Sequence, residues 1–399
     1  MISKRLVFKA LIYLCIYHAL SFILSTIMEK RFMQFLSIQH VVTSDFTYND
    51  LFYRVQYKSE KDNQVRKHKE EILIVNTARL QGQNFRSDLA QVIERVQEYQ
   101  PKAVGVDITF RNRWDRGNKS LFKALSAHKN IICAFEASNK KHSKLLLPPE
   151  IKMGDVDFPK NQHSIRFYKG GDKTMAYQLF KMARGKNSKN QVSSVKSFPI
   201  SFTSIHDGVV GLDDVFSDNY DKNYKVIDAR SLMEEEYAAQ HYGPVLKGSI
   251  VIIGHTGGYF DVEDKHAVPT DTTRLVNRKL IMPGAAIHAN ALSNLLDDRI
   301  FHEPNTLLVN IILNLVMFLM VLLILRHPMK LFLLSGLAVF SIVWIWIAMY
   351  LMELNIYIQV GVTLLELMIL EEFIETFDPF VMRLWNRIRN KKEKNSPTV

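Results

Sequence analysis

Polar residues follow four apolar segments of this sequence, and their positions suggest where a small molecule could bind. Asn76, Asp107, Glu136 and His255 each end or follow a short run rich in β-branched and other apolar residues. In open α/β sheets, ligands collect at the carboxyl ends of the strands, near the point where the strand order reverses. Asp107 interrupts an apolar run, so its carboxylate is expected to be partly buried and to need hydrogen-bond partners. It either caps a loop as a structural carboxylate or contacts a ligand directly.

The segment 255–283 is a second candidate for recognition, either of a ligand or of another subunit. It follows Gly254, contains Gly257 and Gly258 near its start, and then becomes dense in charge. Glycine permits close backbone approach or a positive φ, but the lysine and Ser/Thr of a phosphate-binding loop are missing. The alternative interpretation is a solvated connection held by its own ion pairs. The charged candidates of this segment are Asp261, Glu263, Asp264, Lys265 and His266.

Histidines and carboxylates in and after this segment are the residue types that bind zinc, but their spacing matches no recognised metal motif. The residues concerned are His255, His266, His288, Asp261 and Asp264. No metal and no cofactor is therefore predicted. His288 and Asn290 stand two positions apart on a predicted helix, so they point to different faces and cannot both contact one ligand directly. Asn290 is expected to satisfy backbone groups of a loop.

The sequence contains no motif of a catalytic nucleophile, so we predict no catalytic residue and no enzymatic activity. There is no G-x-S-x-G motif, and Cys133 lies in an apolar segment, where a cysteine is usually an inert core residue. A metal-assisted hydrolase is kept as an alternative, because a sequence does not show whether two carboxylates lie close together in space.

The elements that must position these residues alternate between strand and helix. Apolar β-rich runs and segments with helical spacing of apolar residues follow one another with short links. This rhythm predicts an α/β fold, with a mostly parallel sheet and covering helices. Strands are expected at 72–77, 103–110, 130–137 and 248–256, and helices at 86–99, 120–127, 174–184 and 284–296. The segment 185–197 is interpreted as a solvated loop.

Four apolar runs of about 20 residues interrupt an otherwise ordinary composition, and this is the length that crosses a lipid bilayer. The chain has 399 residues, of which 47% are hydrophobic and 23% charged. Clustering of the apolar residues excludes a soluble cytosolic protein, a disordered chain and a secreted disulfide scaffold, and Cys15 and Cys133 are not expected to pair. The predicted domains are an anchor at 6–28, an extracytoplasmic domain at 29–305, a three-helix membrane bundle at 306–374 and a basic tail at 375–399. The bundle comprises spans at 306–326, 331–352 and 356–374.

Positive charge predicts the orientation of these spans, because Lys and Arg favour the cytoplasmic side. Basic residues precede the first run, occupy the connection 327–330 together with Arg326, and fill the tail. With four spans, all three basic clusters fall on one side. We therefore expect a multi-pass membrane protein, with both termini in the cytoplasm and residues 29–305 outside it. The net charge is +11, but no nucleic-acid-binding motif accompanies it, so no nucleic acid partner is expected.

Three polar residues in the predicted bundle are candidates for contact with a membrane partner. Asn310 and Asn314 lie four positions apart, on one face of a span, where interhelical hydrogen bonds contribute about 0.6 kcal/mol each. Glu366 lies near the middle of the last span, and an ionisable group at that depth usually faces a partner or a cavity. Alternatives for Glu366 are a neutral side chain bonded within the bundle or part of a proton path. The tail attracts anionic lipid or docks a cytoplasmic partner.

A series of motifs in this membrane frame closely resembles the second type of CHASE domain. The series comprises YNDLFYRVQ at 48–56, ILIVNTA, QPKAVGVDITF, KGSIVIIGHTGGYFDVEDKHAVPT and MPGAAIHANALSNLL. The resemblance covers roughly residues 45–373 and implies an extracytoplasmic sensory domain of a bacterial receptor in the cytoplasmic (inner) membrane. Such receptors commonly act as homodimers. Such domains usually feed a kinase or cyclase after the last span. Residues 378–399 hold neither, so a stand-alone form without an output module is expected.

Two functions follow from these expectations. The first is a membrane-anchored sensor or accessory protein, which binds an envelope ligand or protein partner and relays through its bundle to a separate output protein. The second is a structural or anchoring subunit of a multi-protein complex of the cell envelope. Both take the lipid bilayer and another membrane protein, or a second copy of the chain, as partners.

Overall fold

The structure is a computed structural model, and it divides into two compact units that we treat separately. One unit comprises Met1–Tyr48 and His302–Val399, and the other comprises Asn49–Phe301. In the second unit the structure describes residues 71–80, 82–110, 117–138, 147–158, 165, 167–185, 197–200, 202, 224–256, 265–267 and 281–300. In the first it describes 6–15, 18–19 and short stretches between 311 and 383.

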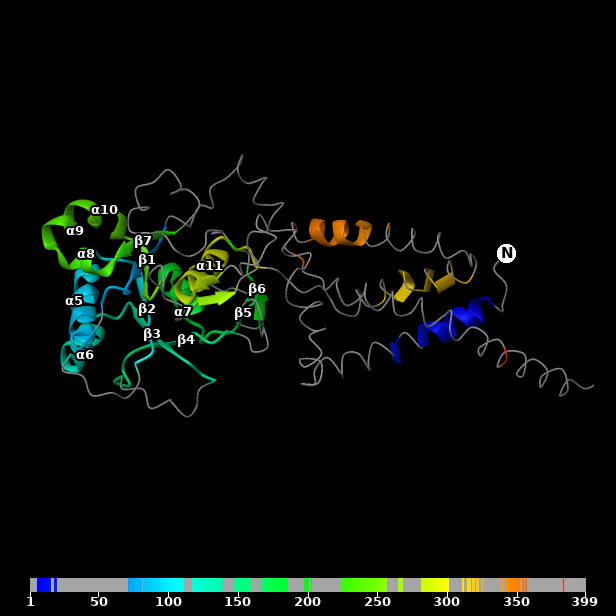
Figure 1. The fold of residues 1–399 in the computed structure, drawn as a ribbon, viewed down its shortest axis with the longest axis horizontal. Helices are drawn as coiled ribbons and strands as arrows, with labels where there is room; N and C mark the ends of the chain where they lie inside the picture. The colour runs from blue at the N-terminus through cyan, green and yellow to red at the C-terminus, as the bar shows by residue number, and fades with distance from the viewer. Residues whose placement is uncertain are drawn as a thin grey trace, which may run out of the picture. The chain divides into compact units, whose positions relative to one another are not determined.

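A six-stranded sheet forms the centre of the second unit (Figure 1). Its strand order is β4-β3-β2-β8-β1-β7, and every neighbouring pair runs parallel. The late strand β8 therefore lies between β1 and β2, which are the first two strands in the sequence. The strands are β1 (Ile72–Asn76), β2 (Ala103–Asp107), β3 (Ile131–Phe135), β4 (Met153–Asp155), β7 (Lys225–Asp228) and β8 (Ile250–Gly254).

Helices cover both faces of this sheet, as the near-continuous apolar strands require, because a parallel sheet is buried on both sides. α5 (Phe85–Glu98), α6 (Asn118–Ala127) and α8 (Ala229–Met233) pack on one face, and α7 (Met175–Arg184) and α11 (Gly284–Leu296) pack on the other. Two short helices, α9 (Glu235–His241) and α10 (Gly243–Leu246), follow α8. Two-stranded antiparallel sheets are formed by β5 (Phe167–Lys169) with β6 (Ser197–Pro199) and by β9 (Lys265–Ala267) with β10 (Ile281–Pro283).

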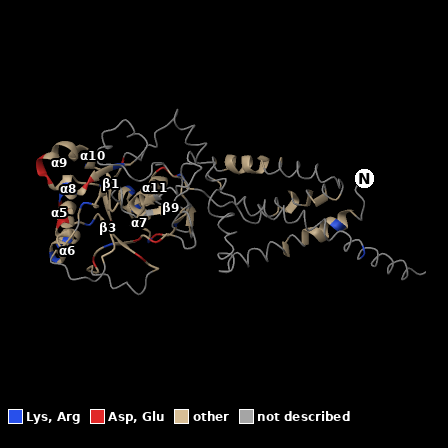
Figure 2. Ribbon diagram, viewed as in Figure 1, with Lys and Arg blue, Asp and Glu red and all other residues tan. Residues whose placement is uncertain are grey.

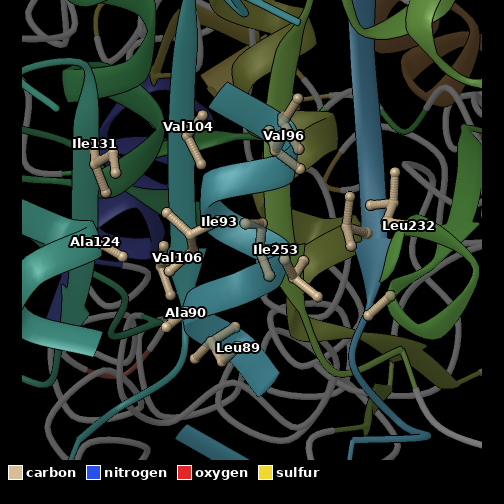
Figure 3. Packing of buried hydrophobic residues seen from close by; sticks show 14 of the residues in the cluster. Leu89, Ala90, Ile93, Val96, Val104, Val106, Ala124, Ile131, Leu232 and Ile253 are labelled. Atoms are coloured by element: carbon tan, nitrogen blue, oxygen red, sulfur yellow. The ribbon is translucent and has the colours of Figure 1, made fainter. Parts of the chain in front are cut away.

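The core beneath α5 results from two matched periodicities. Side chains at alternate strand positions point to one face, and those of β2 and β8 that point toward α5 are branched aliphatics. On α5, Leu89, Ile93 and Val96 recur at helical spacing and are fully buried. Figure 3 shows these side chains over Val104, Val106 and Ile253. Each such burial stabilises the fold by about 1.5–3 kcal/mol.

On the opposite face, α7 packs close to the sheet because two strands have glycine at the positions that face this helix. A Cβ added at Gly154 of β4 would lie 2.7 Å from the Met175 Cα, which is helix backbone. A Cβ added at Gly105 of β2 would lie 2.9 Å from Leu179 Cδ1, the end of a flexible side chain. The two glycines thus set the distance between α7 and the sheet.

The predicted α/β fold with a mostly parallel sheet is confirmed. The four predicted strands and four predicted helices are all present, with ends that differ by up to three residues. Cys133 is buried in β3, as expected, and Cys15 and Cys133 are free. The sequence did not predict β4, β5, β6, β7, α8, α9, α10, β9 or β10, which are short or lie between long loops. Ser197, placed in the solvated loop, begins β6.

The predicted membrane spans fall mostly on residues that are not described. Within the part of the chain that the structure describes, no single helix combines the length and apolar character that a membrane crossing needs. The spans 6–28, 306–326, 331–352 and 356–374 therefore stay predictions, and so do the basic tail and its orientation.

Alanine at Gly154 is expected to destabilise the protein more than alanine at Gly105. At Gly154 the new methyl group meets helix backbone, and such overpacking costs about 1–3 kcal/mol. At Gly105 the end of Leu179 can rotate away, so the cost is smaller. Denaturant unfolding of the purified full-length variants, followed by circular dichroism, measures both. Equal destabilisation, or the reverse order, would contradict this account of how α7 packs.

Candidate functional site

Acidic residues end three of the six parallel strands, and all of these ends lie along one edge of the sheet. Asp107, Asp155 and Asp228 are the last residues of β2, β4 and β7, and the side chain of each is at least nine-tenths buried. Asp155 and Asp228 each pair with a basic side chain, since an unpaired buried carboxylate is costly, and Asp107 faces a histidine that is basic only when it is protonated. Arg79 Nη1 lies 3.1 Å from Asp228 Oδ2, Lys169 Nζ pairs with Asp155 Oδ2, and His288 Nε2 lies 3.8 Å from Asp107 Oδ1.

These acids differ from the charges on the outer helices. Acidic residues lie on α9 and basic residues on α6, on the layer that covers the first face (Figure 2). Glu235, Glu236, Lys119 and Lys123 are exposed there, where ion pairs contribute little. The edge of the sheet is therefore the place where charge is desolvated and held in fixed geometry.

Asn76 fastens two strand exits to each other. Its Oδ1 accepts hydrogen bonds from the backbone N–H of Ala78 at 3.0 Å and of Thr256 at 3.1 Å. Ala78 follows β1 and Thr256 follows β8, so one side chain fixes the path of both loops. His255 lies at the start of the second loop and is half-buried. Asn76 thus has a structural role at the point where β1 and β8 leave the sheet.

A buried cluster of polar residues lies at the end of β2, between the sheet and α11. His288 of α11 is 2% exposed and Tyr168 of β5 is 1% exposed. The Tyr168 hydroxyl lies 2.6 Å from His288 Nδ1, on the other side of the ring from Asp107. The imidazole therefore bridges a tyrosine and a carboxylate that come from separate elements of the fold.

Small residues make room for this cluster. A Cβ added at Gly254, the last residue of β8, would lie 3.0 Å from the Cβ of Ala285 and 3.2 Å from that of Asp107. Because contacts that short are rarely tolerated, glycine at this position lets the first turn of α11 reach the sheet beside Asp107. His288, one turn further along α11, is then carried to the carboxylate.

Phe158 covers the histidine. Its ring stacks on that of His288, with centroids 5.2 Å apart and an interplanar angle of 16°. The same ring meets His266 of β9 edge-on at 4.9 Å. Phe158 follows β4 and is half-buried, so it separates the buried imidazole from the half-buried one.

The pKa of Tyr168 lies well above its usual value. Burial is the main cause, since it disfavours the charged phenolate, and the nearby carboxylates of Asp107 and Asp155 raise the pKa further. A backbone hydrogen bond from Ala176, in the first turn of α7, acts in the opposite direction. Tyr168 therefore keeps its proton throughout the physiological range and acts as a hydrogen-bond donor.

A second network fixes the neighbouring strand ends. Asp155 Oδ1 accepts a hydrogen bond from the Asp157 N–H at 3.1 Å, and Asp157 accepts from both the backbone and the hydroxyl of Ser138. Lys169 follows Tyr168 directly, so its pair with Asp155 anchors β5 to the edge of the sheet. Tyr168 is thereby held in position from the β4 side.

The structure brings together some of the predicted site residues and separates others. Asp107 and His288 form an ion-pair contact if the ring is protonated, and His266 lies next to them across Phe158. Asn290 points elsewhere, as its spacing from His288 predicted. We expected it to bond loop backbone. Its amide donates to the Ala286 carbonyl of its own helix at 2.8 Å and approaches Met282 Sδ, and the Tyr224 hydroxyl lies 3.4 Å from its Oδ1.

Other predicted site residues are not tested. Asp261, Glu263, Asp264, Asn310 and Glu366 lie outside the described residues, and Asn314 is half-buried in a helical stretch of the other unit. Among the residues that are described, no group of three or more His, Cys, Asp or Glu side chains is arranged to hold a metal ion.

Tyr168, Phe158 and Lys169 were missed by the sequence analysis. Tyr168 and Lys169 belong to a strand of three residues, FYK, which is too short to show a period. The residues around Tyr168 do not alternate between apolar and polar either, since Phe167 precedes it and Lys169 follows it.

Comparison with known proteins agrees with this architecture. The family model described as CHASE2 domain matches residues 23–326, so the chain belongs to the CHASE2 family of extracytoplasmic sensory domains. The expected family resemblance is thereby confirmed. Neither the curated proteins nor the solved structures contain a significant match.

Replacing Asn76 with alanine is expected to destabilise the domain. Two backbone N–H groups would lose their acceptor, and an unsatisfied buried donor costs about 1–3 kcal/mol. Asn76→Asp is the matched control, because aspartate keeps an oxygen at the position of Oδ1 and should retain most of the stability. Equilibrium unfolding of the two purified variants tests this. An Asn76→Ala variant as stable as the parent would show that Asn76 does not fasten the two loops.

Proposed function

We propose that this protein is a membrane-anchored sensor, which binds an envelope ligand or protein partner through its CHASE2 domain and relays binding to a separate output protein. The observation that carries the proposal is the paired and buried charge at the carboxyl edge of a doubly wound sheet. Ligands of such sheets bind at this edge, and the proposal involves no catalytic step.

The arrangement of the edge supports recognition. Strand exits from β1, β2, β4 and β8 converge there, and their polar side chains are fixed by Asn76, by Lys169 and by the His288 contacts. Rigid placement of polar groups lowers the entropic cost of binding a ligand. The segments that follow β2 and β8, including the charged candidates Asp261, Glu263 and Asp264, start from this edge.

Apolar surface on the other unit supports attachment to a membrane. Ile311, Leu315 and Leu319 recur every four residues and are each more than half exposed. Ile342, Trp346 and Tyr350 recur in the same way and are at least 53% exposed. Such stripes of apolar side chains seldom face water in soluble proteins. Lipid, with Trp346 and Tyr350 as amphipathic aromatics, would cover them.

The location is testable by labelling a single cysteine in intact cells. In a Cys15→Ser background, Ser126→Cys places a thiol on the exposed end of α6. Cys133 does not interfere, because it is buried and burial raises the pKa of its thiol to about 12. We expect a membrane-impermeant maleimide to label Ser126→Cys without lysis. Ser396→Cys, in the predicted cytoplasmic tail, is the control and should react only after permeabilisation. Labelling of both only after lysis would refute the proposed location.

Purification distinguishes a sensor from a fixed subunit. Extraction of the full-length protein in mild detergent is expected to yield a monomer or homodimer, with the output protein recovered in less than equal amounts. A stoichiometric assembly with several other membrane proteins would instead favour a structural or anchoring role.

A further inference from the structure

The imidazole of His288 lies between a donor and a carboxylate, and this arrangement favours a different partner in each protonation state. Tyr168 Oη is 2.6 Å from Nδ1, which is a full hydrogen bond. Asp107 Oδ1 is 3.8 Å from Nε2, which is too long for one. Of these two contacts, only the one to the tyrosine is therefore a hydrogen bond in the observed geometry.

The hydrogen bonds around Tyr168 suit a neutral ring that acts as the acceptor. The phenolic oxygen receives a backbone hydrogen bond from Ala176 of α7, and burial keeps the proton on the phenol. In the tautomer with its proton on Nε2, the neutral ring accepts the Tyr168 O–H at Nδ1, and this is the tautomer that we consider. Neutral His288 thus supplies the acceptor for a buried hydroxyl.

Protonation removes that acceptor. When a proton from solvent binds Nδ1, an N–H faces the Tyr168 O–H, and the hydroxyl must turn away or lose its partner. At the same time the imidazolium is attracted to Asp107, and closing the 3.8 Å gap to a hydrogen bond brings the ring nearer the sheet by roughly 1 Å. In the neutral state His288 is bonded to Tyr168 of β5, and in the protonated state it is bonded to Asp107 of β2. The two states therefore differ in the strand to which His288 links α11.

Charged and titratable groups lie around the ring on several of the described elements. From β2 it faces Asp107, and from β5 it faces Tyr168, behind which Lys169 is paired with Asp155 of β4. His266 of β9 lies beyond Phe158. The basic residues of α7, Lys181 and Arg184, lie in its last turn, at the opposite end from Ala176. α11 itself has no other ionisable residue in its sequence.

We propose that the proton is a signal for this sensor, and that His288 is the group that binds it, exchanging the Tyr168 contact for the Asp107 contact. The proposal rests on the proposed sensory function for its biological meaning. α11 is the element through which it acts. The helix carries His288, and residues 297–305 separate its end from the apolar run that begins at residue 306.

Hydrogen exchange of the full-length protein, detected by mass spectrometry at pH 5.5 and 7.5 and corrected for intrinsic exchange, tests the proposal. At the lower pH, amides of β5 and of the first turn of α7 should exchange about three- to tenfold faster, because the Tyr168 link is lost. His288→Gln should abolish this difference. His241→Gln is the matched control, since His241 is exposed on α9, and it should respond as the parent does.

Two further variants keep the test independent of the stability of His288→Gln. Tyr168→Phe removes the link itself, so β5 and the first turn of α7 should exchange at the faster rate at both pH values, and the pH difference should vanish although His288 is present. Asp107→Asn removes the charge that favours the imidazolium, so the midpoint of the pH response, measured over a series of pH values, should fall. A parent protein with no pH response, a response that persists in His288→Gln or in Tyr168→Phe, one that disappears in His266→Gln instead, or a midpoint that does not fall in Asp107→Asn would each overturn the proposal. These measurements use purified protein, so they give a result whether or not the labelling of Ser126→Cys supports the proposed location.

Discussion

Close approach between helix and sheet is the constraint on which the second face of the domain depends. Gly105 and Gly154 leave no side chain under α7, and Gly254 leaves none under the start of α11. A side chain at Gly154 would meet the backbone of α7, and one at Gly254 would meet Ala285 and push the start of α11, which carries His288, away from Asp107. The polar cluster at the strand ends is therefore a product of apolar packing. The three glycines therefore determine where the Asp107 carboxylate can meet His288. Protein interiors are packed too densely for a helix to shift locally.

The two faces show why some of this architecture could be predicted and some could not. The strand at β2 and the helix α5 are encoded by local patterns, which are long enough to show a period. β4 and β5 have three residues each, and their pairing is decided by tertiary contacts. The burial of Asp107 followed from its place in an apolar run. Its partner His288 could not be inferred, because the two are far apart in sequence and meet only when β8 and α11 have assembled. Tyr168 was missed because its strand, β5, is too short to show a period.

Membership of the CHASE2 family and the geometry of the edge together define what kind of protein this is. The family supplies the sensory class, whereas the edge supplies residues through which a sensory domain could act. At that edge, paired acids are buried, loop exits are fastened by Asn76, and one imidazole has two possible partners. A fold of this kind serves many functions, so the functional assignment depends on the particular side chains at the strand ends.

The position of β8 between β1 and β2 has a consequence for folding during synthesis. Neither β1 nor β2 has its final neighbour until residues 250–254 have been synthesised, since β8 alone joins them. Before that point the nascent domain consists of two half-sheets with open backbone edges, which are templates for intermolecular pairing. Assembly must then close loops of long sequence separation, which slows folding. A fragment that ends before β8 would expose two unpaired strand edges. Any shortened version intended for purification must therefore extend past β8.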